Sequence, residues 1–462
     1  LSLVAATLAI AGQTLPAHKI NRIIIISVIV GGLIVLIDSY WPFARSAPPA
    51  LFAGAIPIVA IGVVLFFLVT VIRQFQSYPL QTKLLLAFFL VALLPLSVLA
   101  ISNDNAERTF LTNSANQSLN SAATRIANEI DSFFNTETGL LKVEADLPSL
   151  TDFLRIREDF RTADSPYELQ ISGLLAILAQ DTPLPITEPG TKISVPTYLL
   201  LDGNGKVVAS NDRTRLKQNL ADQTYFKNPI QTRALYISSL SFTGQVHVAD
   251  IYMATPVLDA QQNIIGVFAA RFDTNWLQAI TAGSNNIAGP QSFGMVFDIV
   301  DQNYIHIAHG LEPYKIGMVV GQLDSTAARN LQSLNRIPGG APESLSTNLT
   351  DLNNHLLNIS TQPDFAAADI GAGAKIYQAA VTTIKSGQPW LVAFFQPQDV
   401  FLEPANVQTQ NTIKLALAIS VLVAAAAVGG AQVLTGPIVR LTSIVTHITA
   451  GDLSARARVE TG

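Results

Sequence analysis

The residues of this chain that could carry out chemistry do not form a known catalytic motif. A P-loop, a Gly-x-Ser-x-Gly nucleophile turn and an HExxH zinc helix are all missing from the 462 residues. The chain has no cysteine, which excludes thiolate nucleophiles, disulfides and cysteine-bound zinc or iron–sulfur clusters. We therefore expect no catalytic residue and no cofactor in this chain.

Two histidines come nearest to a metal site. His306 and His309 could offer imidazole ligands, with Asp298 or Asp301 nearby in the sequence. Residues an odd number apart in a β-strand point to opposite faces of the sheet. The two imidazoles are therefore expected to diverge, and we predict no metal site.

A second set of residues suits the binding of a small molecule, because it combines aromatic side chains with one acid and one base. The set consists of Tyr198, Tyr225, Phe226, Tyr236, Asp250, Tyr252 and Arg271. Two alternatives remain open. Each aromatic side chain could pack in a core instead, and Arg271 could form an ion pair with Asp250 or Asp273.

Strand–turn–strand patterns position these residues. Asp-Gly and Asn-Gly favour tight hairpin turns, and both occur in Asp202–Gly205. The patterns pair residues 198–201 with 206–210, 246–257 with 264–272, 293–300 with 304–308, and 375–384 with 390–396. We expect an α+β fold with two mixed units, each an antiparallel sheet with helices.

A long helix is expected ahead of the strands, because no proline occurs between Ile101 and Pro148. Apolar residues recur there at steps of three and four: Leu119, Ala122, Ile126, Ile130 and Phe133. The resulting stripe could pack on the neighbouring sheets or on the same helix of a second copy.

The composition indicates a membrane protein. The chain is 49% hydrophobic and 13% charged, with a mean hydropathy of +0.36, whereas soluble domains have about 25% charged residues. So much apolar material also excludes intrinsic disorder. The excess lies in blocks close to the roughly 20 residues that a membrane helix needs. The expected spans are about 1–12 (partial), 20–37, 50–72, 84–101 and 412–434.

Charge places the loops on two sides of a plasma membrane. Lys19, Arg22, Arg73, Lys83 and Arg440 flank the apolar blocks where a cytoplasmic side would lie. Residues 102–411 carry more acidic than basic residues and are expected to be extracytoplasmic, with residues 435–462 cytoplasmic. This acidic exterior argues against nucleic acid as a partner.

Several runs of sequence resemble a double Cache domain. YLLLDGNGKVVASN, DQTYF and MATPVLDAQQNIIGVFAARF are similar to its membrane-distal module. FGMVFDIVDQNYIHIAHG and KSGQPWLVAFFQP are similar to its membrane-proximal module. The resemblance covers residues 105–405 and implies a distal module at about 150–280 and a proximal one at about 281–405. Cache domains are PAS-like extracytoplasmic ligand sensors of prokaryotic receptors.

The resemblance implies that the distal module holds the small ligand. Members that bind amino acids carry an arginine two residues before an aromatic pair, and an aspartate at the end of the last pocket strand. The matching positions here are Gln223, before Tyr225 and Phe226, and Arg271. This chain therefore lacks the arginine that would bind a carboxylate through two hydrogen bonds. It also lacks the aspartate that would pair with an ammonium group. An amino acid is therefore not the expected ligand, and Arg271 could favour a small carboxylate instead.

The end of the chain resembles the first helix and connector of a HAMP domain, a dimeric module that passes motion from a membrane span to an output domain. Pro437 suits the first turn of a helix, and Ile438, Leu441, Val445 and Ile448 form a coiled-coil-like seam. The residues that would carry the relay are Pro437, Leu441, Gly451, Asp452, Leu453 and Glu460. An ordinary amphipathic tail is the alternative.

Together these patterns predict a homodimeric transmembrane signal-transduction receptor. The apolar start at Leu1 and the half-length HAMP pattern indicate that both ends are cut. An output domain, such as a histidine kinase, cyclase or phosphatase, would then follow Gly462, so whether the whole protein is an enzyme is left open. One alternative is a cell-surface adhesion or assembly protein. A transporter is disfavoured, because the apolar blocks lack a central charge or a broken Gly/Pro pair.

Overall fold

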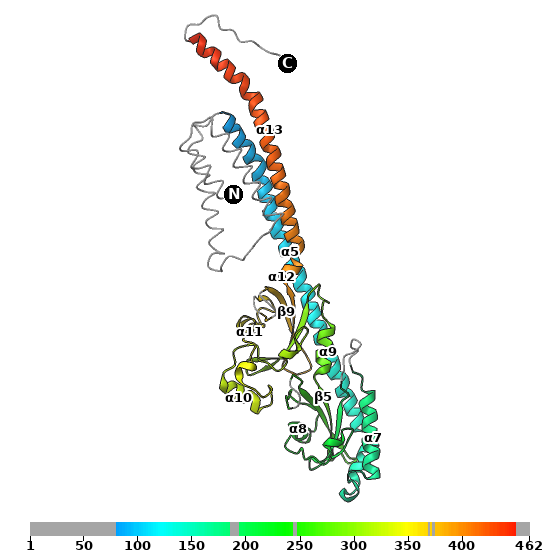
Figure 1. Cartoon of the computed structure of the whole chain (residues 1–462). Coiled ribbons are helices and arrows are strands. Elements are labelled where there is room, and N and C mark those ends of the chain that lie inside the picture. Colours follow the sequence, from blue (N-terminus) through cyan, green and yellow to red (C-terminus); the bar gives the residue numbers. More distant parts are fainter. Residues whose placement is uncertain (1–79, 185–193, 244–246, 368–369, 372–374, 450–462) are drawn as a thin grey trace. The chain divides into compact units, whose positions relative to one another are not determined.

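The computed structural model describes residues 80–184, 194–243, 247–367, 370–371 and 375–449 (Figure 1). The chain forms two compact units. The larger unit is Phe110–Leu402, and the smaller one contains the described residues before Phe110 and after Leu402.

The larger unit contains two five-stranded antiparallel sheets. The first sheet consists of β1 (Thr197–Asp202), β2 (Val207–Ser210), β3 (Tyr236–Ile237), β4 (Asp250–Leu258) and β5 (Ile264–Asp273). The second sheet consists of β6 (Phe293–Val300), β7 (Asn303–His309), β8 (Asp364–Ala367), β9 (Tyr377–Thr383) and β10 (Trp390–Pro397). Their orders, β2-β1-β5-β4-β3 and β7-β6-β10-β9-β8, repeat one topology. The expected α+β fold with antiparallel sheets is confirmed.

Helices precede, connect and follow the strands. The α-helices are α5 (Leu80–Ala145), α6 (Pro148–Arg155), α7 (Pro166–Asp181), α8 (Thr224–Thr232), α9 (Asn275–Gly283), α10 (Ser325–Ser333), α11 (Thr350–Leu357), α12 (Gln398–Phe401) and α13 (Glu403–Thr449). Short 3₁₀ turns are η2 (Glu158–Phe160), η3 (Arg213–Arg215), η4 (Pro313–Lys315) and η5 (Pro342–Ser344).

The predicted hairpins are all present. In the first, the Asp202 carboxylate accepts hydrogen bonds from the backbone N–H groups of Asn204 and Lys206, each at 3.0 Å. Gly205 has a φ of +79°, and a Cβ there would lie 2.6 Å from the Cα of Ala221. Glycine is required for both reasons, so the Asn-Gly signal reflects a real constraint.

The apolar stripe of α5 packs inside the larger unit. Leu119, Ile126 and Ile130 are fully buried, and they share one hydrophobic core with residues from both sheets. Phe133 stacks on Trp276 of α9 with ring centroids 3.9 Å apart. Figure 1 shows α5 passing beside both sheets. Of the two options for the stripe, packing on the sheets is the one observed.

A β-bulge in β7 corrects the expectation for the two histidines. Val296 pairs with Ala308 and Phe297 pairs with His306, so Ile307 is an extra residue without a partner across the strand pair. A bulge shifts the alternation of side chains by one position. His306 and His309 therefore lie on the same face, with ring centroids 5.7 Å apart. The prediction that they point to opposite faces is wrong.

In the smaller unit, α5 and α13 are joined by polar contacts. Arg108 Nη2 donates a hydrogen bond to Asn406 Oδ1 at 2.8 Å, and the Thr409 hydroxyl donates to the Asp104 carboxylate. α13 continues through Pro437 without a break. The expected new helix start at Pro437 is therefore not observed, because one helix already includes the residues on both sides of it.

The apolar stretches 84–101 and 412–434 lie in α5 and α13. None of the helices in the described part of the chain combines the length and the apolarity that crossing a membrane requires. The structure thus does not support the two expected spans. The expected spans 1–12, 20–37 and 50–72 lie outside the described residues.

Candidate functional site

One face of the first sheet brings together most of the residues predicted to bind a ligand. Side chains alternate between the faces of a strand. Arg271 of β5 pairs across the ladder with Tyr252 of β4, and Tyr236 of β3 pairs with Ala254. Tyr225 and Phe226 belong to one apolar cluster with Tyr236, Tyr252 and Ala254. This sheet face and α8, which packs against it, form what we call the first-sheet site.

The centre of the first-sheet site is a pair of stacked tyrosines. The rings of Tyr225 and Tyr252 are nearly parallel, 8° apart, with centroids separated by 4.1 Å. Burial raises the pKa of both phenols, and Asp250 adds to the shift at Tyr252. Both hydroxyls are therefore neutral at physiological pH and can donate or accept a hydrogen bond.

A charged pair lies beside the two tyrosines. Arg271 Nη2 lies 2.7 Å from Asp250 Oδ1, and the two side chains are 27% and 6% exposed. Burial alone would lower the pKa of Arg271, but the hydrogen bond and charge of Asp250 outweigh it and the pKa is raised. The guanidinium remains charged, and its buried Nε has no hydrogen-bond partner in the described structure. The ion pair with Asp250 that the sequence left as an alternative is formed, with Arg271 only partly exposed.

Tyr198 lies on the opposite face and does not belong to the first-sheet site. It pairs with Ala270, one position away from Arg271, so alternation turns it toward the core that contains α5. Its ring stacks on Phe268 at 5.2 Å. Its hydroxyl lies 3.2 Å from Thr182 Oγ1 and 3.4 Å from Glu144 Oε1. The structure therefore places Tyr198 apart from the other residues predicted to bind the ligand.

Arg215 of η3, which the predicted set does not include, is a basic residue whose charge reaches the first-sheet site, although its Nε lies 3.7 Å from Asp212 Oδ2. Its positive charge lowers the pKa of both Tyr225 and Tyr252, in opposition to burial. The Arg213–Arg215 pair of basic residues in a loop was the available signal. Gln223, in contrast, is the N-cap residue of α8 and makes no side-chain capping hydrogen bond.

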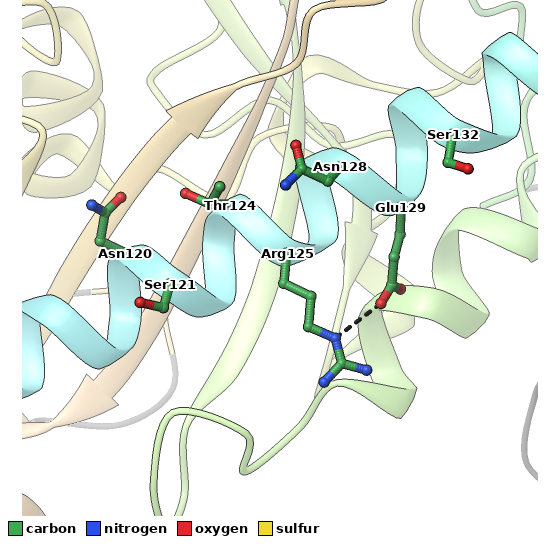
Figure 2. Close-up of a pocket in the computed structure, with 7 residues that line it drawn as sticks. All are labelled: Asn120, Ser121, Thr124, Arg125, Asn128, Glu129 and Ser132. Carbon is green, nitrogen blue, oxygen red and sulfur yellow. Dashed lines mark hydrogen bonds and ion pairs between the residues drawn. The ribbon is translucent and has the colours of Figure 1, made fainter.

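A different concave surface lies on α5 (Figure 2). It is lined by Asn120, Ser121, Thr124, Arg125, Asn128, Glu129 and Ser132. Its only charged groups form an ion pair, Arg125 Nε to Glu129 Oε1 at 2.9 Å, with side chains 63% and 39% exposed. It offers no aromatic surface and no desolvated charge, so we place the candidate site on the first sheet instead.

The remaining predicted positions can be placed as follows. Pro437 and Leu441 are exposed residues of α13, while Gly451, Asp452, Leu453 and Glu460 lie outside the described residues. No group of three or more His, Cys, Asp or Glu side chains suited to a metal ion occurs within the described part of the chain.

Comparison with protein families identifies the larger unit. Residues 107–405 match the Cache domain family. The chain belongs to the Cache domain family. No curated protein shows a match.

Solved structures with a similar arrangement include two bacterial sensor domains. The sensor domain of the V. cholerae histidine kinase DctB is 17% identical, with 60% of this chain and 95% of that chain covered and a TM-score of 0.44. The ligand-binding domain of the Campylobacter jejuni chemoreceptor Tlp3, in complex with 4-methylisoleucine, is 12% identical. There 64% of this chain and 95% of that chain are covered, with a TM-score of 0.40.

Proposed function

We propose that this Cache protein is a sensory receptor that binds a small molecule at the first-sheet site. The observation that carries the proposal is the partly exposed ion pair of Arg271 and Asp250 beside the stacked rings of Tyr225 and Tyr252. Flat aromatic surface can bind the apolar part of a ligand, and the charged pair can fix its orientation.

The charges indicate which ligands fit best. Arg271 has an Nε–H group without a hydrogen-bond partner among the described residues. Asp250 is already engaged by Arg271. The ligand we propose is therefore a small organic molecule with an acceptor group, and a carboxylate suits the guanidinium best.

The route of the signal is also part of this proposal. A dimeric receptor in the cell membrane would have residues 102–411 outside and pass the signal along α13 to a HAMP domain and a cytoplasmic output domain. The support is the apolar stretches, the basic flanks and the HAMP-like pattern after Pro437 in the sequence. A ligand shifts such a receptor only by its difference in affinity for the two signalling states.

A thermal-shift screen of the full chain with small organic acids, amines and neutral compounds tests the binding claim. We expect at least one organic acid to raise the melting temperature. Arg271→Met should abolish that rise, and the matched control Arg329→Met, on the exposed surface of α10, should retain it. A panel without any stabilising compound would overturn the proposal, as would a hit that Arg271→Met leaves unchanged.

A further inference from the structure

The second sheet contains a buried polar cluster that the proposed function does not use. It consists of His306 and His309 of β7 and Lys315 of η4. The two histidines are 0% exposed and Lys315 is 6% exposed. The bulge at Ile307 brings both imidazoles to one face, where His306 lies against Phe297 and His309 stacks on Phe293.

The hydrogen bonds of His309 define which nitrogen carries its proton. The backbone N–H groups of Leu311 and Glu312 both donate to its Nδ1, at 3.2 and 3.1 Å. Nδ1 therefore has the lone pair, and Nε2 carries the hydrogen of the neutral ring. Nε2 lies 3.8 Å from Glu312 Oε2, beyond hydrogen-bond distance, and has no acceptor in the described structure. A buried N–H group is left without a partner.

His306 is in a more extreme position. Neither of its ring nitrogens has a hydrogen-bond partner among the described residues, although the side chain is completely buried. Buried polar groups in folded proteins are nearly always paired with protein, water or ligand. An imidazole in which both nitrogens are unpaired indicates that a group beyond the described residues completes this cluster.

Lys315 supplies positive charge to the same place. Its ammonium lies 2.5 Å from Glu312 Oε2 and donates to the backbone oxygen of Gly371 at 3.2 Å. Burial lowers the pKa of His306 and His309, and the charge of Lys315 lowers both further. The Glu312 carboxylate already pairs with the Lys315 ammonium, so the neutral rings offer N–H groups to an acceptor beside a compensated ion pair.

We propose that His306, His309 and Lys315 form a second ligand site, which binds the carboxylate of a small organic acid. A carboxylate has only acceptor oxygens, so it can take N–H groups from both imidazoles. Phe293 and Phe297 line the cluster and suit the short apolar remainder of the acid.

NMR of the full chain with ¹⁵N-labelled histidine tests this site, with acetate and propionate as the probes. We expect saturable shifts of the His306 and His309 ring nitrogens. The ring of His355 in α11, which stacks on Phe365 of β8, should not shift. Absence of saturable shifts at His306 and His309 with both acids would overturn the proposal.

Variants locate the binding. His306→Leu should weaken it by about tenfold or more, and His355→Leu should leave it unchanged. If His306→Leu does not fold, Lys315→Met, which keeps most of the side-chain volume, should weaken binding in the same way. Arg271→Met should preserve the shifts of both rings. Loss of the shifts in Arg271→Met would assign them to the first-sheet site and contradict a second site. Absence of binding at the second site would not affect the first-sheet site, which the thermal-shift screen tests separately.

Discussion

At the scale of single residues, Glu137 of α5 should couple folding to pH. Its side chain is 2% exposed, and Oε1 has no hydrogen-bond partner in the described structure. Burial raises its pKa to about 8, and the nearby charge of Glu144 adds to the shift. The carboxyl group is therefore protonated in the folded protein at neutral pH, whereas in the unfolded chain it is ionised.

We predict that Glu137→Gln stabilises the protein at alkaline pH. The raised pKa gives a stabilising contribution that is complete below the unfolded pKa of about 4.3 and is lost as pH rises through about 8. We compare the free energy of unfolding of the variant with that of the wild type. The difference, variant minus wild type, should rise by roughly 2–4 kcal/mol from about pH 5 to pH 8.5. Urea unfolding at the two pH values measures this difference.

The control for this experiment is Glu343→Gln on the exposed surface of η5. Its difference from the wild type should be nearly independent of pH. An equal pH dependence in the two variants would show that burial of Glu137 does not control its ionisation.

The composition of the first-sheet site was largely predictable from the sequence. Tyr225, Phe226, Tyr236 and Tyr252 were chosen as aromatic residues, and the structure gathers all of them in one cluster. Tyr198 lies on the other face because the strand register, which decides the face, depends on pairing between distant strands. Arg215 was missed because a loop residue gains its place only from the folded chain.

At the scale of elements, a carboxylate joins α5 to the hairpin between β9 and β10. Asp131 accepts hydrogen bonds from the backbone N–H of Lys385 at 2.9 and 3.0 Å and from that of Ser386 at 2.8 Å. Hydrogen bonds to a charged acceptor are stronger than neutral ones. Asp131 thus fixes the position of the second sheet along α5.

We predict that Asp131→Ala lowers the free energy of unfolding by about 1–3 kcal/mol, because it removes the charged acceptor of two partly buried backbone N–H groups. Asp152→Ala, on the exposed surface of α6, should change it by less than about 0.5 kcal/mol. Chemical denaturation monitored by tryptophan fluorescence compares the two. Similar losses in both variants would argue against this role of Asp131.

Hairpins and bulges differ in how well the sequence predicts them. The turns at Asp202–Gly205 and Ser386–Pro389 carry residues with specific backbone preferences, and both hairpins were predicted. The bulge at Ile307 has no such signature, because isoleucine is equally typical of a regular strand. The second ligand site depends on this bulge and could not be inferred before the structure.

At the scale of the whole molecule, the Cache match explains why two sheets repeat the same strand order. Within the larger unit, one helix packs its apolar stripe against both sheets and forms a shared core. A ligand at either sheet therefore borders elements that contact α5. Both proposed sites therefore lie on sheets that pack against the same helix, α5.

The most direct test of ligand sensing is calorimetric titration of the full chain with the best organic acid from the screen. The account predicts saturable heat in the wild type, and a dissociation constant at least about tenfold higher in both Tyr252→Ala and Arg271→Met. Arg329→Met should match the wild type. Unchanged affinity in Tyr252→Ala and Arg271→Met, with both variants folded, would contradict binding at the first-sheet site.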